Sequence, residues 1–282
     1  MARWASFIDS RRSETPALLL DTGDFFRPEL TENDEIDYRY FFEGMKLMGY
    51  DAVNIGANDI LYGRDRLRNA AKDGNLPLVS SNILDRRDDD LLAKPFIIKY
   101  LGGKRTLFGM REGIRVGIFS VTDPSFFDRI DSSVSKNYKI KDPRITALEA
   151  ISRLKEKGCD LVIAISHMGW EKSVRFASDV PGIDIVVNGH RSHEGTFQQH
   201  AGSTLIVDTG IHRISFTEIE ARFFKKKFLL KATEMGGVAR NSAERPDLLE
   251  LELKYGRELR EKRIADRREN EVEIEKDNRP AR

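Results

Sequence analysis

The 282-residue sequence has a single cysteine, Cys159, and no apolar run near the roughly 20 residues that a membrane-spanning helix needs. A lone cysteine excludes an intramolecular disulfide, and its place before an apolar stretch favours a small core residue. An excess of charge is also missing, because 47 Lys and Arg stand against 46 Asp and Glu. We therefore expect neither nucleic acid nor an anionic membrane as a partner. The first residues lack the apolar segment of a signal peptide, so the sequence as written predicts a cytoplasmic protein.

Seven apolar stretches predict strands that are buried on both faces, because each is a nearly continuous apolar run. They lie in the segments PALLLDTGD, YDAVNIGAND, LPLVSSN, IRVGIFSVTD, CDLVIAISHMG, GIDIVVNGH and STLIVDTG. Amphipathic stretches at 35–49, 63–74 and 142–158 have helical spacing and lie between several of these strands. This alternation of strand and helix predicts a layered α/β fold.

Two further stretches, 96–119 and 213–235, predict antiparallel hairpins, so we expect mixed sheets flanked by helices. Near residue 239 the composition changes to almost entirely charged residues. We therefore divide the chain into a domain at 1–238 and a charged tail at 239–282. The tail is predicted to be a long exposed helix that frays into a disordered end. A solvated segment is the first interpretation of the tail, and docking of a partner is the alternative.

Polar residues collect where the predicted strands end. Since the carboxyl ends of strands in α/β sheets gather at one edge and bind ligands there, we expect these side chains to converge. They are Asp21, Asp24, Asn58, Asp59, His167, His190 and His193.

Taken singly, each of these residues has an ordinary explanation, such as a turn cap or a surface hydrogen bond. Together they favour a shared site, because three of the five histidines follow apolar strands directly. Carboxylate, amide and imidazole ligands in combination suit Mn, Fe or Zn better than Ca. Glycines lie between them and allow tight turns, namely Gly23, Gly56, Gly169 and Gly189.

The order of these motifs resembles the calcineurin-like metallophosphoesterases, and in particular their 5′-nucleotidase branch. The matching segments are LLLDTGDFF, GYDAVNIGANDILYG, CDLVIAISHMG, VPGIDIVVNGHRSH and TLIVDTG, within residues 3–220. The resemblance implies a four-layer α/β/β/α sandwich of two mixed sheets with two divalent metal ions at one edge. It also implies that a metal-activated hydroxide hydrolyses a small phosphate monoester, with a nucleotide as the expected substrate.

The resemblance assigns metal ligands residue by residue. Asp24 matches the aspartate that bridges both metals, and His167 and His190 match two histidines that bind one of them. The family's Gly-His-x-His turn is one residue longer here, as Gly-His-Arg-Ser-His, so His193 is a displaced match to the histidine that binds the other metal.

The segment GANDILYG departs from the family's GNHE-type turn. Without a gap, Ala57 replaces the asparagine ligand and Asn58 replaces the histidine that protonates the leaving group, so the general acid is missing. Alternatively, the turn is rearranged and Asn58 itself binds the metal. An amide cannot transfer a proton at neutral pH, whereas Asp59 could if its pKa were raised.

The strand that opens the family's sequences, which ends in Asp-x-His, has no counterpart in this sequence. We expect either an incomplete sequence or a protein that lacks this strand. The first metal site would then keep only Asp24 and His193, so we expect one tightly bound metal. A lost upstream signal would make the protein periplasmic or exported.

Two functions from different classes are consistent with the sequence. The first is a metal-dependent phosphoesterase that acts on a small phosphate ester. The second is a catalytically weak or inactive relative that serves as a binding or scaffold module, with the charged tail as its docking element. The altered GANDILYG turn favours the second.

Overall fold

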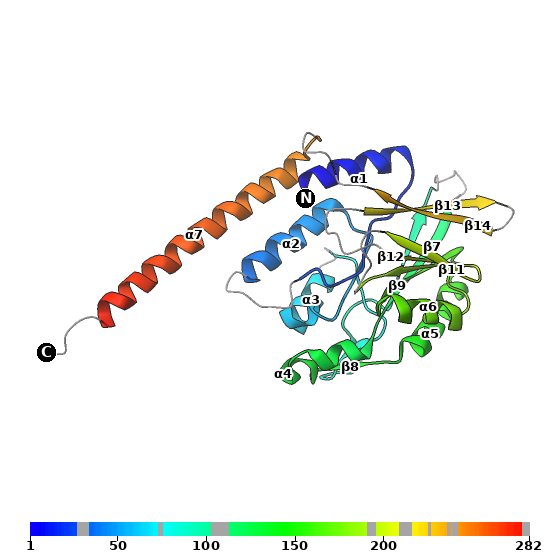
Figure 1. The fold of residues 1–282 in the computed structure, drawn as a ribbon, viewed down its shortest axis with the longest axis horizontal. Helices are drawn as coiled ribbons and strands as arrows, with labels where there is room; N and C mark the ends of the chain where they lie inside the picture. Colours follow the sequence, from blue (N-terminus) through cyan, green and yellow to red (C-terminus); the bar gives the residue numbers. More distant parts are fainter. Residues whose placement is uncertain are drawn as a thin grey trace.

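The structure, a computed structural model, describes residues 1–26, 34–72, 76–102, 113–190, 196–208, 216–224, 227–235, 238 and 242–277 (Figure 1). Its α-helices are α1 Ala2–Glu14, α2 Asp34–Met48, α3 Arg64–Lys72, α4 Ser132–Ser135, α5 Pro143–Glu156, α6 Trp170–Asp179 and α7 Pro246–Asp277. Two 3₁₀ helices lie at Asp59–Tyr62 (η1) and Pro124–Arg129 (η2). The predicted helices at 35–49, 63–74 and 142–158 correspond to α2, α3 and α5.

The largest sheet has six strands in the order β11–β12–β10–β9–β7–β6. Their bounds are β6 Phe96–Leu101, β7 Ile114–Thr122, β9 Leu161–His167, β10 Ile185–Asn188, β11 Phe197–Ala201 and β12 Thr204–Asp208. The four inner strands are parallel, and the outer strands β6 and β11 are antiparallel to their neighbours. This sheet is therefore mixed, as expected.

A second, smaller sheet runs β1–β2–β3, at Leu20–Asp21, Ala52–Asn54 and Leu78–Val79. Both of its pairings are parallel, so within the described residues it contains no antiparallel strand. Two further sheets are antiparallel: β5–β4–β8, at Asp90–Leu91, Ile83–Asp85 and Tyr138–Ile140, and the hairpin β13–β14, at Phe216–Phe224 and Lys227–Met235. Both hairpins predicted from the sequence are present, as β6–β7 and β13–β14.

Alternation along the strands stacks these elements into four layers, because successive side chains point to opposite faces. In β9, Leu161, Ile163 and Ile165 face the smaller sheet, whereas Val162 and Ala164 face α5 and α6. The far face of the smaller sheet packs against α2 and α3 (Figure 1). This arrangement is the expected α/β/β/α sandwich.

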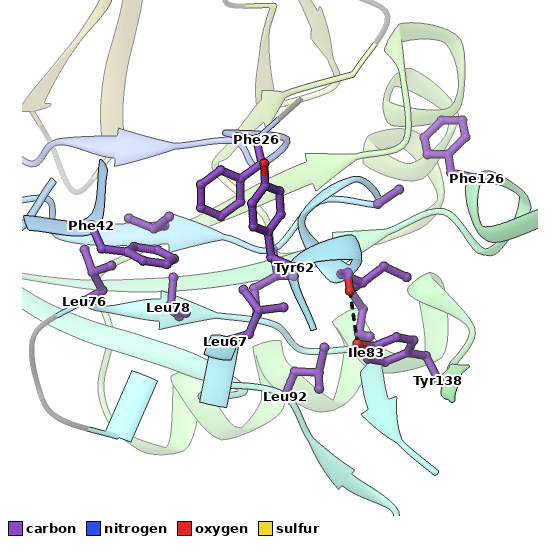
Figure 2. Packing of buried hydrophobic residues seen from close by; sticks show 14 of the residues in the cluster. Phe26, Phe42, Tyr62, Leu67, Leu76, Leu78, Ile83, Leu92, Phe126 and Tyr138 are labelled. Carbon is purple, nitrogen blue, oxygen red and sulfur yellow. Dashed lines mark hydrogen bonds between the residues drawn. The ribbon is translucent and has the colours of Figure 1, made fainter. Parts of the chain in front are cut away.

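An aromatic-rich core lies below the ends of β1 and β2 (Figure 2). The Phe26 ring stacks on Tyr62, with 3.6 Å between the ring centroids, and packs edge-on against Phe42. The hydroxyl of Tyr138 donates to the carbonyl of Ile60, 3.3 Å away. These contacts fix η1, and with it the turn that precedes η1 at the edge of the sheet.

Helix α7 packs its first turns against α1 and α2 and then extends away from the body of the molecule (Figure 1). Leu248 is fully buried at its start, and Glu252 accepts a hydrogen bond from the backbone N–H of Ala2. Farther along, the Tyr255 hydroxyl donates to Asp37. The tail is therefore helical, as expected, and its first half is anchored to the domain; residues 278–282 lie outside the described part of the chain.

No helix within the described residues is long and apolar enough to cross a membrane.

Candidate metal centre

Strand β9 delivers His167 to the edge where β1 and β2 also end. Because Ser166 faces α6, the next residue, His167, faces the smaller sheet. There its Nδ1 donates to the carbonyl of Thr22, 2.9 Å away, and its Nε2 lies 3.1 Å from Asp24 Oδ2. The Thr22 carbonyl fixes the tautomer, so Nε2 presents a lone pair.

Two of the converging residues adopt a left-handed backbone conformation. Asp24 has a φ of 58° and His190 a φ of 62°, values that are uncommon for residues other than glycine. These conformations aim the two side chains at each other, and His190 Nδ1 lies 3.1 Å from the same Asp24 Oδ2. Such strain persists only where the surroundings enforce it, and it is concentrated at functional sites.

Asp24, His167 and His190 each offer one ligand atom, and the three atoms lie within 4.8 Å of one another. The His167 side chain is fully buried, yet its Nε2 has no hydrogen-bond partner. A buried lone pair that faces a carboxylate oxygen is unfavourable unless a proton or a cation lies between them. Metal–nitrogen and metal–oxygen bonds of about 2.1 Å place neighbouring ligand atoms about 3.0–3.4 Å apart, so the observed spacing suits a divalent ion.

The carboxylates at this edge differ in their acidity. Burial alone would raise the pKa of Asp24, but its interactions with the imidazoles of His167 and His190 outweigh burial and hold that pKa well below the usual range. Burial raises the pKa of Asp21 to about 6, against one hydrogen bond from the N–H of Gly23. Asp24 is therefore the carboxylate that stays charged and available to a cation.

The predicted site residues Asn58 and Asp59 contact the cluster through backbone N–H groups, which was not expected. Asn58 donates its backbone N–H to Asp24 Oδ1, at 2.8 Å. The fully buried carboxylate of Asp59 accepts from the backbone N–H groups of Asp24, Gly56 and Phe26, at 2.9, 2.8 and 3.3 Å. Burial, and then the charge of Asp24, raise the pKa of Asp59 well above the usual range. Asp59 thus contacts the backbone of the Asp24 turn.

The last predicted ligand, His193, lies outside the described residues, so its place at the site stays a prediction. The sequence analysis missed Phe126, which lies in η2. Its ring stacks on His190 with a centroid distance of 3.8 Å and an interplanar angle of 26°. Lys172 forms an ion pair with Asp123 beside this ring, with its Nζ 5.9 Å from the ring centroid. The apolar character of Phe126 gave no signal beyond core packing.

Close backbone approach explains two of the glycines. A Cβ atom on Gly56 would lie 2.5 Å from the backbone nitrogen of Asp24, and one on Gly189 would lie 2.7 Å from the Cβ of Thr22. Both distances are far below van der Waals contact, so only glycine lets the three turns come together.

The chain resembles known phosphoesterases in sequence. It is 26% identical over 207 residues to the 2′,3′-cyclic-nucleotide 2′-phosphodiesterase/3′-nucleotidase of Salmonella typhimurium, covering 67% of this chain and 32% of that protein. It is 27% identical over 216 residues to the 5′-nucleotidase of Vibrio parahaemolyticus, covering 67% and 35%. No family model matches.

The fold provides the second comparison. The calcineurin-like phosphoesterase YfkN of Bacillus subtilis superposes with a TM-score of 0.69 at 20% identity, over 92% of this chain and 88% of that one. The chain is therefore similar to nucleotide phosphoesterases in sequence and to a calcineurin-like phosphoesterase in fold. The chain spans about a third of the length of the two curated relatives named above.

Proposed function

We propose that this chain is a divalent-metal-dependent phosphoesterase that hydrolyses a small phosphate monoester, with a nucleotide as the substrate class. The observation that carries this proposal is the buried, unpartnered Nε2 of His167, which faces Asp24 Oδ2 at 3.1 Å. The phosphoesterase names of the sequence relatives support the substrate class.

The proposed ligands are Asp24, His167 and His190. A divalent ion bound there supplies Lewis-acid polarisation and charge neutralisation to a phosphate ester. The chain's own residues prepare the site: Thr22 fixes the His167 tautomer, and the Asn58 N–H leaves Asp24 Oδ2 as the ligand oxygen by holding Oδ1. Mn, Fe or Zn suits two imidazoles and one carboxylate. On this proposal the described residues hold one metal ion, and a second ion would depend on His193.

The test combines Mn²⁺ titration by calorimetry with hydrolysis of AMP and p-nitrophenyl phosphate. We expect one tight Mn²⁺ site and metal-dependent turnover in the wild type, and loss of both in His167→Ala. His200→Ala is the matched control, because His200 is exposed on β11, opposite Leu205 near the far end of β12. A His167→Ala variant that binds Mn²⁺ as tightly as the wild type would refute the proposed site.

A binding or scaffold module is the second candidate, favoured by the turn at Asn58 and Asp59. Among the described residues, the only imidazoles in the cluster are the two proposed ligands, and Asp59 is enclosed by backbone N–H groups. This arrangement leaves no evident group to protonate a leaving alcohol. The charged tail, proposed as a separate segment at 239–282, would then dock a partner through the part of α7 that extends from the body.

The substitution Asn58→His separates the two candidates. Asn58 has helical φ and ψ angles of −73° and −27°, which histidine adopts readily. If the chain is an enzyme that lacks only a proton donor, we expect kcat to rise in the variant by about 100-fold, the usual contribution of general acid catalysis. Tight Mn²⁺ binding without turnover in either protein would favour the binding module.

A further inference from the structure

A buried polar network lies beneath the two histidines, on the α6 side of the large sheet. The side chains of Ser166, Ser173 and Asn188 are all fully buried. The hydroxyls of Ser166 and Ser173 lie 2.7 Å apart, and the Ser173 hydroxyl lies 2.6 Å from the Asn188 amide. Alternation explains the placement, because Ser166 precedes His167 on β9 and Asn188 ends β10 on the face opposite Val187.

The hydrogen-bond surroundings select the orientation of the Asn188 amide. With Nδ2 directed toward the turns, its two N–H groups face three acceptors: the Gly169 carbonyl at 3.2 Å, the Gly189 carbonyl at 3.3 Å and the Ser173 hydroxyl at 2.6 Å. The opposite orientation would turn the amide oxygen toward both carbonyls. It would keep the Ser173 contact at 2.6 Å, with the hydroxyl donating to Oδ1, and a long contact, 3.4 Å, from Nδ2 to Asp208. Two carbonyl acceptors outweigh that single long contact.

The two carbonyls belong to the turns that carry the proposed ligands. Gly169 lies in the turn two residues after His167, and Gly189 directly precedes His190. The backbone already links these turns, since Gly169 N–H donates to Gly189 O at 3.3 Å and Gly189 N–H to Ser166 O at 2.8 Å. The Asn188 amide contacts the carbonyls of both turns from the α6 side of the sheet, two residues before His190 with its left-handed backbone.

We propose that Asn188 is a positioning residue that clamps the two histidine-bearing turns at the spacing a metal ion requires. This inference rests on the proposed metal-dependent function, and it adds a residue that touches neither the ion nor the substrate. Outer groups that orient metal ligands typically contribute 10- to 100-fold to metal affinity.

The first experiment needs no metal. Amide hydrogen exchange of the full chain in EDTA is compared for the wild type, Asn188→Leu and Ser173→Ala. We expect the Gly169 and Gly189 amides to exchange at least tenfold faster in Asn188→Leu, and by a smaller factor in Ser173→Ala, which keeps the amide. Ser173→Ala alone decides the question if the leucine variant does not fold.

Thr204→Val is the matched control for general destabilisation. The Thr204 hydroxyl is buried and donates to the Ile183 carbonyl at 2.7 Å, at the opposite end of the same parallel strands. We expect this variant to lower the melting temperature while the Gly169 and Gly189 amides keep their relative protection. If both network variants change the exchange of these amides by no more than Thr204→Val does, the clamp is refuted.

Mn²⁺ titration of the same proteins gives the second readout. We expect the dissociation constant to rise at least tenfold in Asn188→Leu and to stay within twofold in Thr204→Val. Unchanged affinity in Asn188→Leu would overturn the positioning role even if the wild type is an active enzyme. Tight binding that the clamp variants weaken, without phosphatase activity in the wild type, would instead overturn the proposed function and leave the clamp supported.

Discussion

The turn after β10 and the turn after β2 both approach Asp24, yet they offer it opposite kinds of group. The first presents the side chain of His190 to Oδ2. The second presents the backbone N–H of Asn58 to Oδ1, while the carboxylate of Asp59 binds backbone N–H groups on both sides of the contact. One turn presents a proposed metal ligand, and the other holds a neighbouring loop. Convergence at a sheet edge therefore does not reveal whether side chains or backbone make the contacts.

The largest expected effect tests the supporting turn. Asp59→Ala should lower the free energy of unfolding by about 3–5 kcal/mol, because three N–H groups, two of them buried and one partly buried, lose their acceptor. Urea denaturation in EDTA measures this loss. Asn58→Ala is the control and should cost less than about 0.5 kcal/mol, since the Asn58 side chain makes no capping bond. Equal losses of stability in the two variants would contradict a supporting role that is specific to the Asp59 carboxylate.

A second prediction concerns pH and the third carboxylate of this edge, Asp21. Its folded-state pKa of about 6 exceeds the ordinary value of 3.8, so the folded protein binds this proton more tightly than the unfolded chain does. The resulting stabilisation is complete below about pH 4 and is lost as the pH rises to about 6, a change of about 3 kcal/mol. Asp21→Asn keeps the acceptor for Gly23 and should lack this loss. Parallel stability curves for both proteins from pH 4 to pH 7, measured by urea denaturation in EDTA, would contradict the prediction.

A third prediction tests the ligand-bearing turn. Gly189→Ala should destabilise the protein by about 1–3 kcal/mol, because the new methyl group would lie 2.7 Å from the Cβ of Thr22 and must displace a turn. Thermal unfolding reports the change. Gly256→Ala on α7 is the control, where the nearest atom is 3.8 Å away and alanine should stabilise the helix slightly. If the two substitutions behave alike, close approach at Gly189 is not what the turn requires.

The smallest expected effect sharpens the comparison at His190. Phe126→Leu should weaken Mn²⁺ binding by about two- to tenfold, because the stacked ring that orients the imidazole is lost. Calorimetric titration measures the change. Phe127→Leu is a matched control, since Phe127 is about equally buried in the same 3₁₀ helix and core but, among the described ring contacts, does not stack on His190. A similar loss of affinity in both variants would attribute the effect to packing in general.

Much of the architecture could be predicted from apolar runs and their spacing. The two-sided burial of β9 and β10 follows from continuous apolar residues, and the helix α5 from its Asp-Pro start and Gly158 end. The approach of Asp24, His167 and His190 follows from the rule that parallel strands end at one edge. The absence of an antiparallel strand from the described part of the smaller sheet was not expected, because strand direction depends on tertiary connections.

The roles of Asp59, Phe126 and Asn188 could not be predicted in the same way. Residue spacing locates a turn but does not determine which rotamer a side chain adopts or which N–H groups surround it. Asp59 was a candidate proton donor, and its enclosure could not be foreseen because two of its three backbone partners, Asp24 and Phe26, come from a distant segment of the chain. The sequence places Asn188 at a strand end and gives no further signal. Its hydrogen-bond network includes Ser173 of α6 and forms only when α6 packs against β10.

The register of the parallel strands also fixes how far each residue at the strand ends reaches toward the site. Thr122 pairs in register with His167 on the neighbouring strand. On three adjacent strands, Asn188 pairs in register with Ser166 on one side and Asp208 on the other. Inserting a single residue within β9 would advance the imidazole by about 3.3 Å and rotate it into the helical layer beneath. Insertions at the opposite edge, such as the exposed Gly202 turn between β11 and β12, leave this alignment untouched. The length of β9 is thus constrained by the position that His167 must take, whereas the loops at the opposite ends of the strands can vary in length.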